Sequence, residues 1–245
     1  MAPKIIAFGS GKGGVGKTTV TLNIGFAMAS LNKKVLIVDT DVSLPNLDLY
    51  TGLEKPIITL LEVLNGTANV QNAIYTIQMG LNIIPCGSSL QALRDINIDK
   101  LGDIISDLKK SEYEFIILDV PAGLSKFSIL PMTHSDEVYI IVNPDQASIA
   151  DAQKVKAVSA LAGFNITGII VNKYKKSIYD DVGIRLGLPV TGIIPEDAAI
   201  VKARTTKKPL LLLKPKSRSS KAMMELARKM CGIPPKKGIL SRLLR

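Results

Sequence analysis

The first residues that could do chemistry lie close to the start of the chain, where residues 9–19 read GSGKGGVGKTT. This stretch contains the pattern G-x-x-x-x-G-K-[ST], formed by Gly11, Gly16, Lys17 and Thr18. Glycines let the backbone fold around an anion with successive N–H groups pointing inward, and a following helix adds its positive N-terminal end. In such a loop the lysine reaches the β- and γ-phosphates of a nucleotide and the hydroxyl binds Mg²⁺.

A glycine-rich loop without a ligand is the alternative interpretation of this stretch. However, an apolar run at residues 5–8 precedes the pattern and an apolar-periodic segment follows it from Val20 onward. Strand, loop and helix in this order are the context that a phosphate-binding loop requires. We therefore expect a nucleotide-binding site here.

The elements that must position this loop follow in regular alternation. Apolar runs predict strands at residues 5–8, 35–38, 81–85, 115–118, 138–142, 166–171 and 190–194. Helical periods or segments are expected at residues 18–31, 57–64, 69–77, 98–108, 124–133, 148–162, 178–187, 197–204 and 218–230, with a connector and one short strand around residues 210–213 between the last two. Near-continuous apolar strands bounded by helices predict a parallel sheet covered on both faces. The expected fold is a three-layer α/β/α P-loop NTPase fold with a mostly parallel, twisted sheet.

Polar residues recur where the predicted strands end. Asp39 and Asp119 each follow an apolar run, as do Asn172 and the turn at residues 195–197. In open α/β sheets, ligands bind outside the carboxyl ends of the strands. One edge of the sheet is therefore predicted to be the active-site edge.

Composition narrows the possible functions. With 245 residues and 47% hydrophobic content, the chain is long enough for one large core, and we expect a single ATPase domain over residues 1–232 followed by a tail over residues 233–245. Cys86 and Cys231 are far apart and His134 is the only histidine, so disulfide frameworks, zinc sites and histidine-based nucleophilic schemes are not expected. The phosphate loop begins too early for a signal peptide, and no apolar run approaches a membrane span, so a cytoplasmic protein is expected.

The positive charge is concentrated at the C-terminal end. The chain has a formal net charge of +10, but residues 201–245 contain fourteen Lys and Arg and a single acid, Glu225. Such asymmetry suggests an anionic partner, either lipid head groups or nucleic acid phosphates, while a solvated face is the simpler alternative.

The last ten residues have the pattern of a short interfacial helix. Ile239, Leu240, Leu243 and Leu244 fall on one helical face, and Lys236, Lys237, Arg242 and Arg245 flank it. Apolar burial could supply roughly 6–12 kcal/mol and the four cations about 4 kcal/mol, against an ordering cost on the order of 10–20 kcal/mol. One tail should bind an anionic membrane weakly, whereas two tails on a dimer gain effective concentration.

Two other partners fit the basic end of the chain. The segment from Lys202 to Lys221 could contact DNA phosphates, which needs only clustered Lys and Arg. Aromatic residues make up 4% of the chain and Trp is absent, so single-stranded nucleic acid, which needs stacking platforms, is not favoured. The tail could also dock a protein partner as an amphipathic helix.

Four motifs taken together support a family resemblance. Lys12 lies inside the loop, D-x-D occurs at Asp39 and Asp41, N-L-D at residues 46–48, and D-x-P-A-G at residues 119–123. In this order they resemble the deviant Walker A ATPases of the MinD/ParA family over residues 4–200. The basic amphipathic tail is similar to that of MinD-type septum-site-determining ATPases. Iron–sulfur carriers and nitrogenase-type reductases of the same superfamily need paired cysteines, which Cys86 and Cys231 do not match.

The resemblance implies an Mg²⁺-dependent ATPase that forms a homodimer around ATP. It implies that Lys12 contacts phosphates on the partner subunit and that Asp41 orients the attacking water, while Thr18, Asp39 and Asp119 support Mg²⁺. The nucleotide would contact Gly11, Lys12, Gly13, Gly14, Val15, Gly16, Lys17, Thr18 and Thr19, with Asn172, Pro195, Glu196 and Asp197 near adenine. A cation placed from outside the loop would stabilise charge on the transferred phosphoryl group, as an arginine finger does.

The function implied by the resemblance is a switch. In its ATP form the dimer would bind the cytoplasmic face of the cell membrane reversibly, work with a protein regulator that the sequence does not identify, and position cell-division or similar machinery. The alternative is a ParA-type partitioning ATPase that binds DNA non-specifically.

Overall fold

A computed structural model describes residues 2–89, 96–175 and 181–234 of the chain. Its centre is an eight-stranded sheet with the strand order β3-β4-β2-β5-β1-β6-β7-β8. The strands are β1 (Lys4–Ser10), β2 (Val35–Asp39), β3 (Tyr75–Thr76), β4 (Asn82–Ile84), β5 (Phe115–Ala122), β6 (Glu137–Val142), β7 (Gly168–Tyr174) and β8 (Val190–Pro195). All neighbouring strands pair in parallel except β3, which runs antiparallel to β4. The expected mostly parallel sheet is confirmed.

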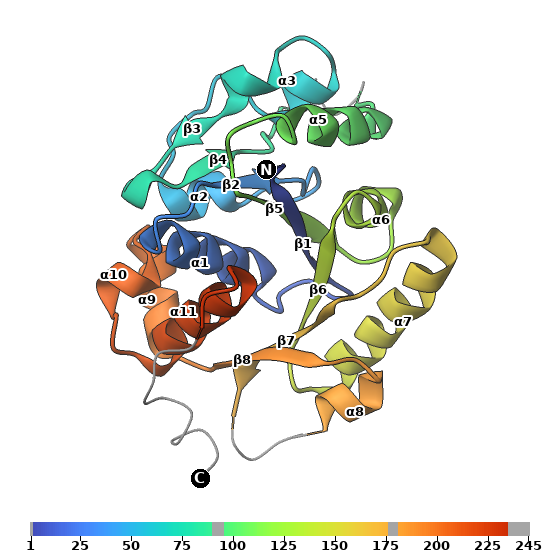
Figure 1. Cartoon of the computed structure of the whole chain (residues 1–245), viewed down its shortest axis with the longest axis vertical. Helices are drawn as coiled ribbons and strands as arrows, with labels where there is room; N and C mark the ends of the chain where they lie inside the picture. The colour runs from blue at the N-terminus through green and yellow to red at the C-terminus, as the bar shows by residue number, and fades with distance from the viewer. Residues whose placement is uncertain (1, 90–95, 176–180, 235–245) are drawn as a thin grey trace.

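Helices cover both faces of the sheet (Figure 1). They are α1 (Lys17–Ser30), α2 (Leu47–Thr51), α3 (Leu60–Leu64), α5 (Leu101–Leu108), α6 (Lys126–Thr133), α7 (Gln146–Ala162), α8 (Val182–Leu186), α9 (Ala198–Thr205), α10 (Leu210–Leu213) and α11 (Arg218–Met230), with 3₁₀ turns at Val70–Ala73, Gln78–Gly80 and Ile98–Lys100. The three layers follow from alternation along the central strands. In β1, Ile5 and Ala7 belong to the core under α5, α6 and α7, while Ile6 and Phe8 belong to the core under α1 and α11.

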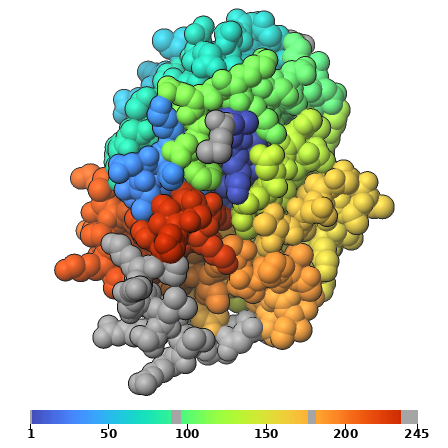
Figure 2. Space-filling model, in the orientation of Figure 1, coloured from blue at the N-terminus to red at the C-terminus, as the bar shows by residue number. Residues whose placement is uncertain are grey.

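Helix α1 is held between the sheet and the C-terminal helices, which Figure 1 shows beside it on the same face. Its residues from Thr19 to Met28 are buried, so it has no single apolar stripe. The buried Asn23 side chain accepts a hydrogen bond from the Leu210 N–H at 3.0 Å. The C-terminal part of the chain is thereby tied to the helix that starts at the phosphate loop. In Figure 2 the segment from α9 to α11, coloured orange to red, forms one side of the surface in view.

Two local expectations are wrong. Residues 210–213 form helix α10, not a strand, because Pro209 precedes the turn and the Leu213 and Lys214 N–H groups donate back to Pro209 and Leu210. Within residues 69–77 only Val70–Ala73 are helical, since Tyr75 and Thr76 pair with β4 as strand β3. The two-residue strand has no periodicity of its own, so its pairing partner decides its conformation.

One predicted helix face is confirmed, and two other predictions fall partly or wholly outside the described residues. The apolar face formed by Ile98, Leu101, Ile104, Ile105 and Leu108 is buried as predicted. Residues 178–180 of the expected helix over 178–187 lie outside the described residues, as do the tail residues Ile239, Leu240, Leu243 and Leu244, so the interfacial helix stays a prediction. Among the described residues, no helix is long and apolar enough to cross a membrane.

Candidate nucleotide-binding site

The phosphate loop joins the end of β1 to the start of α1 at the middle of the sheet. Gly14 and Gly16 have φ angles of 79° and 94°, in the left-handed region that glycine adopts without strain. They turn the chain so that α1 begins at Lys17, with its free N–H groups facing the loop. Lys12, Gly13 and Gly14 are exposed, whereas Val15 and Lys17 are buried. The loop therefore carries one lysine outside and one inside.

The buried lysine of the loop is already paired. Lys17 Nζ lies 2.9 Å from Asp119 Oδ1, and the hydroxyl of Thr21 donates to the same oxygen at 3.0 Å. The other carboxylate oxygen, Asp119 Oδ2, is buried with no hydrogen-bond partner among the described residues. An unpaired buried carboxylate oxygen is costly unless a ligand or water satisfies it. This oxygen therefore marks a place where an ion or its water fits.

Asp39 ends β2, and Asp119 lies beside it within β5, which continues to Ala122. They are register partners in the β2–β5 ladder. Asp39 accepts hydrogen bonds from the backbone N–H groups of Asp41 at 3.0 Å and of Asn46 and Leu47 at 3.3 Å. Burial, and then the negative charge of Asp119, raise the pKa of Asp39 to about 7.

Two buried carboxylates so close together repel each other, and a bound cation would stabilise both of them. Mg²⁺ takes oxygen ligands, keeps several waters and needs few direct carboxylates, so a buried pair beside the loop fits it. The hydroxyl of Thr18, in the first turn of α1, supplies a further oxygen donor at the loop. The donor atoms of Thr18, Asp39 and Asp119, which the resemblance assigns to Mg²⁺, are therefore of the kind that this ion takes.

Asp41 lies in the loop between β2 and α2 and is partly exposed. Its carboxylate accepts the backbone N–H of Leu44 at 3.0 Å. Because the Asp41 N–H is in turn bound by Asp39, the backbone of this predicted water-orienting residue is tied to the carboxylate pair. Lys12, the other predicted catalytic residue, forms no ion pair with any residue in the described ranges.

The predicted adenine contacts come from the ends of β7 and β8. Asn172 is buried, donates to the Val15 carbonyl at 2.8 Å, and leaves its Oδ1 without a described partner. Pro195 pairs with Tyr174, and Asp197 caps α9 by accepting the Ala199 N–H at 2.9 Å. Glu196 forms an ion pair with Lys175 at 2.7 Å. Asn172 therefore lies against the phosphate loop. The turn at residues 195–197 lies at the end of β8, the strand next to β7.

Two residues near the loop were not predicted. Thr21 could have been found, because it lies one helical turn after Lys17 and shares its face toward Asp119. Lys173, whose Nζ donates to the Gly14 carbonyl at 2.9 Å, could not, since only the packing of β7 beside the loop brings the two together.

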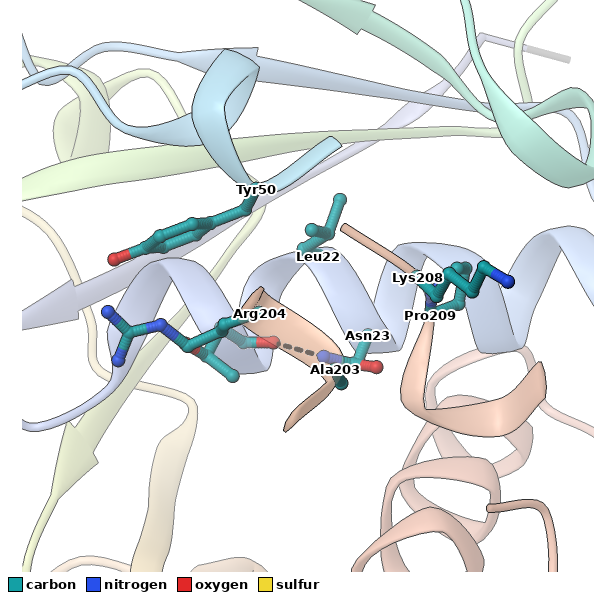
Figure 3. Close-up of a pocket in the computed structure, with 8 residues that line it drawn as sticks. Leu22, Asn23, Tyr50, Ala203, Arg204, Lys208 and Pro209 are labelled. Carbon is teal, nitrogen blue, oxygen red and sulfur yellow. Dashed lines mark hydrogen bonds between the residues drawn. The ribbon is translucent and has the colours of Figure 1, made fainter. Parts of the chain in front are cut away.

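A small pocket lies beside α1, and Figure 3 shows the side chains around it. It is lined by Thr19, Leu22, Asn23, Tyr50, Ala203, Arg204, Lys208 and Pro209, and its volume of about 10 Å³ has room for roughly one water. The guanidinium carbon of Arg204 lies 4.7 Å from the centre of the Tyr50 ring, and Asn23 donates to the Thr19 carbonyl. The pocket is too small for a nucleotide, but it joins α1, α2 and α9.

The fold and the site together define a P-loop NTPase. Strand β1 lies in the middle of a mostly parallel sheet and leads through a glycine-rich loop, which ends in Lys17 and Thr18, into helix α1. Asp119 lies within the neighbouring strand β5, and Asp39 ends the strand beyond it, β2. A family model described as an AAA domain matches residues 3–162. The chain is 37% identical to an uncharacterized ATP-binding protein of Methanocaldococcus jannaschii, over 93% of this chain and 87% of that protein.

Solved structures agree with this class. The septum site-determining protein MinD of Pyrococcus horikoshii, complexed with Mg-ADP, superposes with a TM-score of 0.87 at 33% identity, covering 99% of each chain. MinD in a MinC:MinD cell division complex from Aquifex aeolicus gives a TM-score of 0.85 at 33% identity, covering 96% of this chain and 99% of that one. The chain belongs to the MinD/ParA family of P-loop ATPases.

Proposed function

We propose that this protein is an Mg²⁺-dependent ATPase that acts as a dimerising switch, binds the membrane reversibly in its ATP form, and positions cell-division or similar machinery. The observation that carries the proposal is that two lysines of one loop differ in burial and in pairing. Lys17 is buried and faces Asp119, while Lys12 is exposed and unpaired within the described ranges. The Mg-ADP complex of the Pyrococcus horikoshii relative supports ATP and Mg²⁺ as the ligands.

Within one subunit, the loop residues from Gly11 to Thr19 would bind the phosphates through backbone N–H groups, with Lys17 as the inner cation. Thr18, Asp39 and Asp119 would hold Mg²⁺ directly or through water. When bound, the ion neutralises charge that develops on the phosphate oxygens. Asp41 would accept a hydrogen bond from the attacking water, and its ordered backbone limits where that water can lie.

Lys12 would act on the nucleotide of a second copy of the chain. Its side chain is exposed on the outer rim of the loop, with no carboxylate of the described chain to hold it. A cation supplied from outside an enclosed phosphate stabilises the transition state more than it stabilises bound ATP. Dimerisation and hydrolysis would then depend on each other.

Membrane binding would come from the tail predicted over residues 236–245. The described chain reaches residue 234, where the Pro234 carbonyl accepts a hydrogen bond from Arg228 of α11 at 2.9 Å. The tail would therefore start from a fixed point on the domain. Because a single tail binds weakly, membrane residence would follow the monomer–dimer equilibrium and hence the nucleotide.

A protein regulator is part of the same proposal. A MinD relative from Aquifex aeolicus was solved in a complex with MinC, which supports a protein partner for this chain. We expect this chain to bind a regulator of its own.

DNA is the second candidate partner, and one observation favours it. Eight cations between residues 202 and 221 are exposed, and none forms a salt bridge with a described residue: Lys202, Arg204, Lys207, Lys208, Lys214, Lys216, Arg218 and Lys221. Their segment includes part of the orange and red surface of Figure 2. Exposed cations that form no salt bridge suit a phosphate backbone. In a ParA-type reading, these residues would bind DNA non-specifically.

One experiment separates the two partners. The full chain and a chain ending at residue 235 are sedimented with anionic liposomes and, in parallel, with duplex DNA, each with ATP or ADP. The membrane switch predicts ATP-dependent liposome binding that the shortened chain loses. If the truncation leaves liposome sedimentation unchanged, the membrane-switch proposal is wrong. ATP-dependent, salt-sensitive DNA binding by the shortened chain would instead favour a DNA-partitioning ATPase.

A further inference from the structure

Two consecutive side chains near the end of β7 donate hydrogen bonds to two consecutive carbonyls of the phosphate loop. Asn172 Nδ2 donates to the Val15 carbonyl at 2.8 Å, and Lys173 Nζ donates to the Gly14 carbonyl at 2.9 Å. Both bonds cross from one strand to a loop more than 150 residues away in the sequence. Asn172 belongs to the predicted adenine contacts, whereas Lys173 is not among the predicted nucleotide, metal or catalytic residues.

These two bonds fix the direction of the loop's N–H groups. In a trans peptide the carbonyl of one residue and the N–H of the next point in opposite directions, and the described chain contains no cis peptide. Holding the Gly14 carbonyl toward Lys173 therefore turns the Val15 N–H away from β7. Holding the Val15 carbonyl toward Asn172 does the same for the Gly16 N–H. Neither N–H donates to another residue in the ranges that the structure describes.

The backbone of Lys173, the residue that makes this contact, is strained. Its φ is +53°, in the left-handed region that non-glycine residues rarely adopt. The residues after it are secured to β8, because Tyr174 pairs with Pro195 and the Glu196 N–H donates to the Tyr174 carbonyl at 3.1 Å. Strain of this kind persists only where the surroundings impose it, and it concentrates at functional sites.

We propose that Lys173 is a positioning residue for phosphate binding: its ammonium holds the Gly14 carbonyl out of the cradle and so aims the Val15 N–H at a phosphate oxygen. A carbonyl that swung inward would present a partial negative charge to the phosphate instead of a donor. This role rests on the proposed function only in requiring a nucleoside di- or triphosphate in the loop. It is separate from Lys12 and from the membrane.

The test compares three variants for ADP affinity and for stability without nucleotide. Lys173→Gly removes the amine and relieves the strained φ, Lys173→Met removes the amine but keeps the stem, and Lys173→Arg keeps a cationic donor. ADP and pyrophosphate should both bind about tenfold more weakly to the first two, because a hydrogen bond to a charged group is lost, and Arg should restore binding to within about threefold. Nucleotide-free Lys173→Gly should unfold at the same urea concentration as the parent or a higher one.

Lys110→Gln is the matched control, since it removes one exposed lysine, paired only with Asp107, far from the loop. Its ADP affinity should equal that of the parent. The inference is overturned if Lys173→Gly and Lys173→Met bind ADP as the parent does, or if their loss spares pyrophosphate. It is also overturned if Lys173→Gly is destabilised without nucleotide, since the role would then be structural. A parent chain that fails to bind ADP would remove the proposed function as well, which separates the two failures.

Discussion

Gly11 of the phosphate loop lies directly against the backbone of Asp151 in α7. A Cβ added at Gly11 would be 2.4 Å from the Asp151 carbonyl oxygen, closer than any real contact allows. The first glycine of the motif is thus required by helix packing as well as by the phosphate. Because the obstacle is backbone, a rotamer change cannot relieve it.

We therefore expect Gly11→Ala to lower the free energy of unfolding by about 1–3 kcal/mol, the usual cost of overpacking. Gly13 is the matched control, since a Cβ there meets no atom within 4 Å and its φ is not positive. Gly13→Ala should change the free energy of unfolding by less than about 1 kcal/mol. Urea denaturation of both variants without nucleotide measures the difference, and equal effects would contradict the packing role of Gly11.

Lys12→Ala should separate binding from catalysis. The inner lysine, Lys17, keeps its place beside Asp119 at 2.9 Å, so ATP affinity should fall by less than about threefold. ATP-driven dimerisation and most of the hydrolysis should be lost, because the exposed cation no longer reaches the partner's phosphates. Light scattering with ATP and a phosphate-release assay measure the two effects. An unimpaired ATPase would remove the trans-lysine assignment.

The Tyr50–Arg204 contact links helix α2 to helix α9. Arg204 lies 4.7 Å from the ring centre on an exposed surface, so the pair should contribute about 0.5–1 kcal/mol. A double-mutant cycle with Tyr50→Leu and Arg204→Gln, read by urea denaturation, isolates that coupling. Additive single effects would mean that the two side chains only lie near each other.

Both cysteines should be poorly reactive in the folded protein. Burial raises the pKa of Cys231 to about 11 and that of Cys86 well above its ordinary value of 9.0. At pH 9 the folded thiols stay protonated while those of the unfolded chain ionise. Iodoacetamide should therefore label the native protein much more slowly than the urea-unfolded protein, and Cys86 more slowly than Cys231.

The raised pKa values of the two thiols also make the free energy of unfolding depend on pH. The folded state holds these thiol protons more tightly, so the associated stability is complete below pH 9 and is lost as pH rises through the raised pKa values. Rapid labelling of native Cys86 at pH 9 would contradict its burial.

Much of this architecture could be predicted from local sequence. The apolar runs that end in Asp39 and Asp119 predicted two strands with carboxylates at one edge, and the structure pairs these residues in register. The motif likewise predicted the loop between β1 and α1. These features depend on neighbours in the chain, which periodicity and turn residues report.

Other features depend on contacts between distant segments. Four leucines in a row carry no period, so α10 could not be distinguished from a strand before its contacts with Asn23 and Ser220 were known. Lys173 gave no signal, because its role comes from the loop that β7 passes. The order of strands in the sheet has the same origin, since each crossover depends on packing across the whole domain.

The contact between α1 and the C-terminal segment also has a consequence for synthesis. The Leu210 N–H donates to Asn23 of α1, and Ser219 of α11 donates to the Pro195 carbonyl, so α1 and the end of β8 are both held by residues that follow them in the chain. β1 likewise pairs with β5, more than a hundred residues later. A nascent chain therefore lacks these contacts until α11 has emerged from the ribosome. We expect a nascent chain to capture ATP only after α11 has emerged.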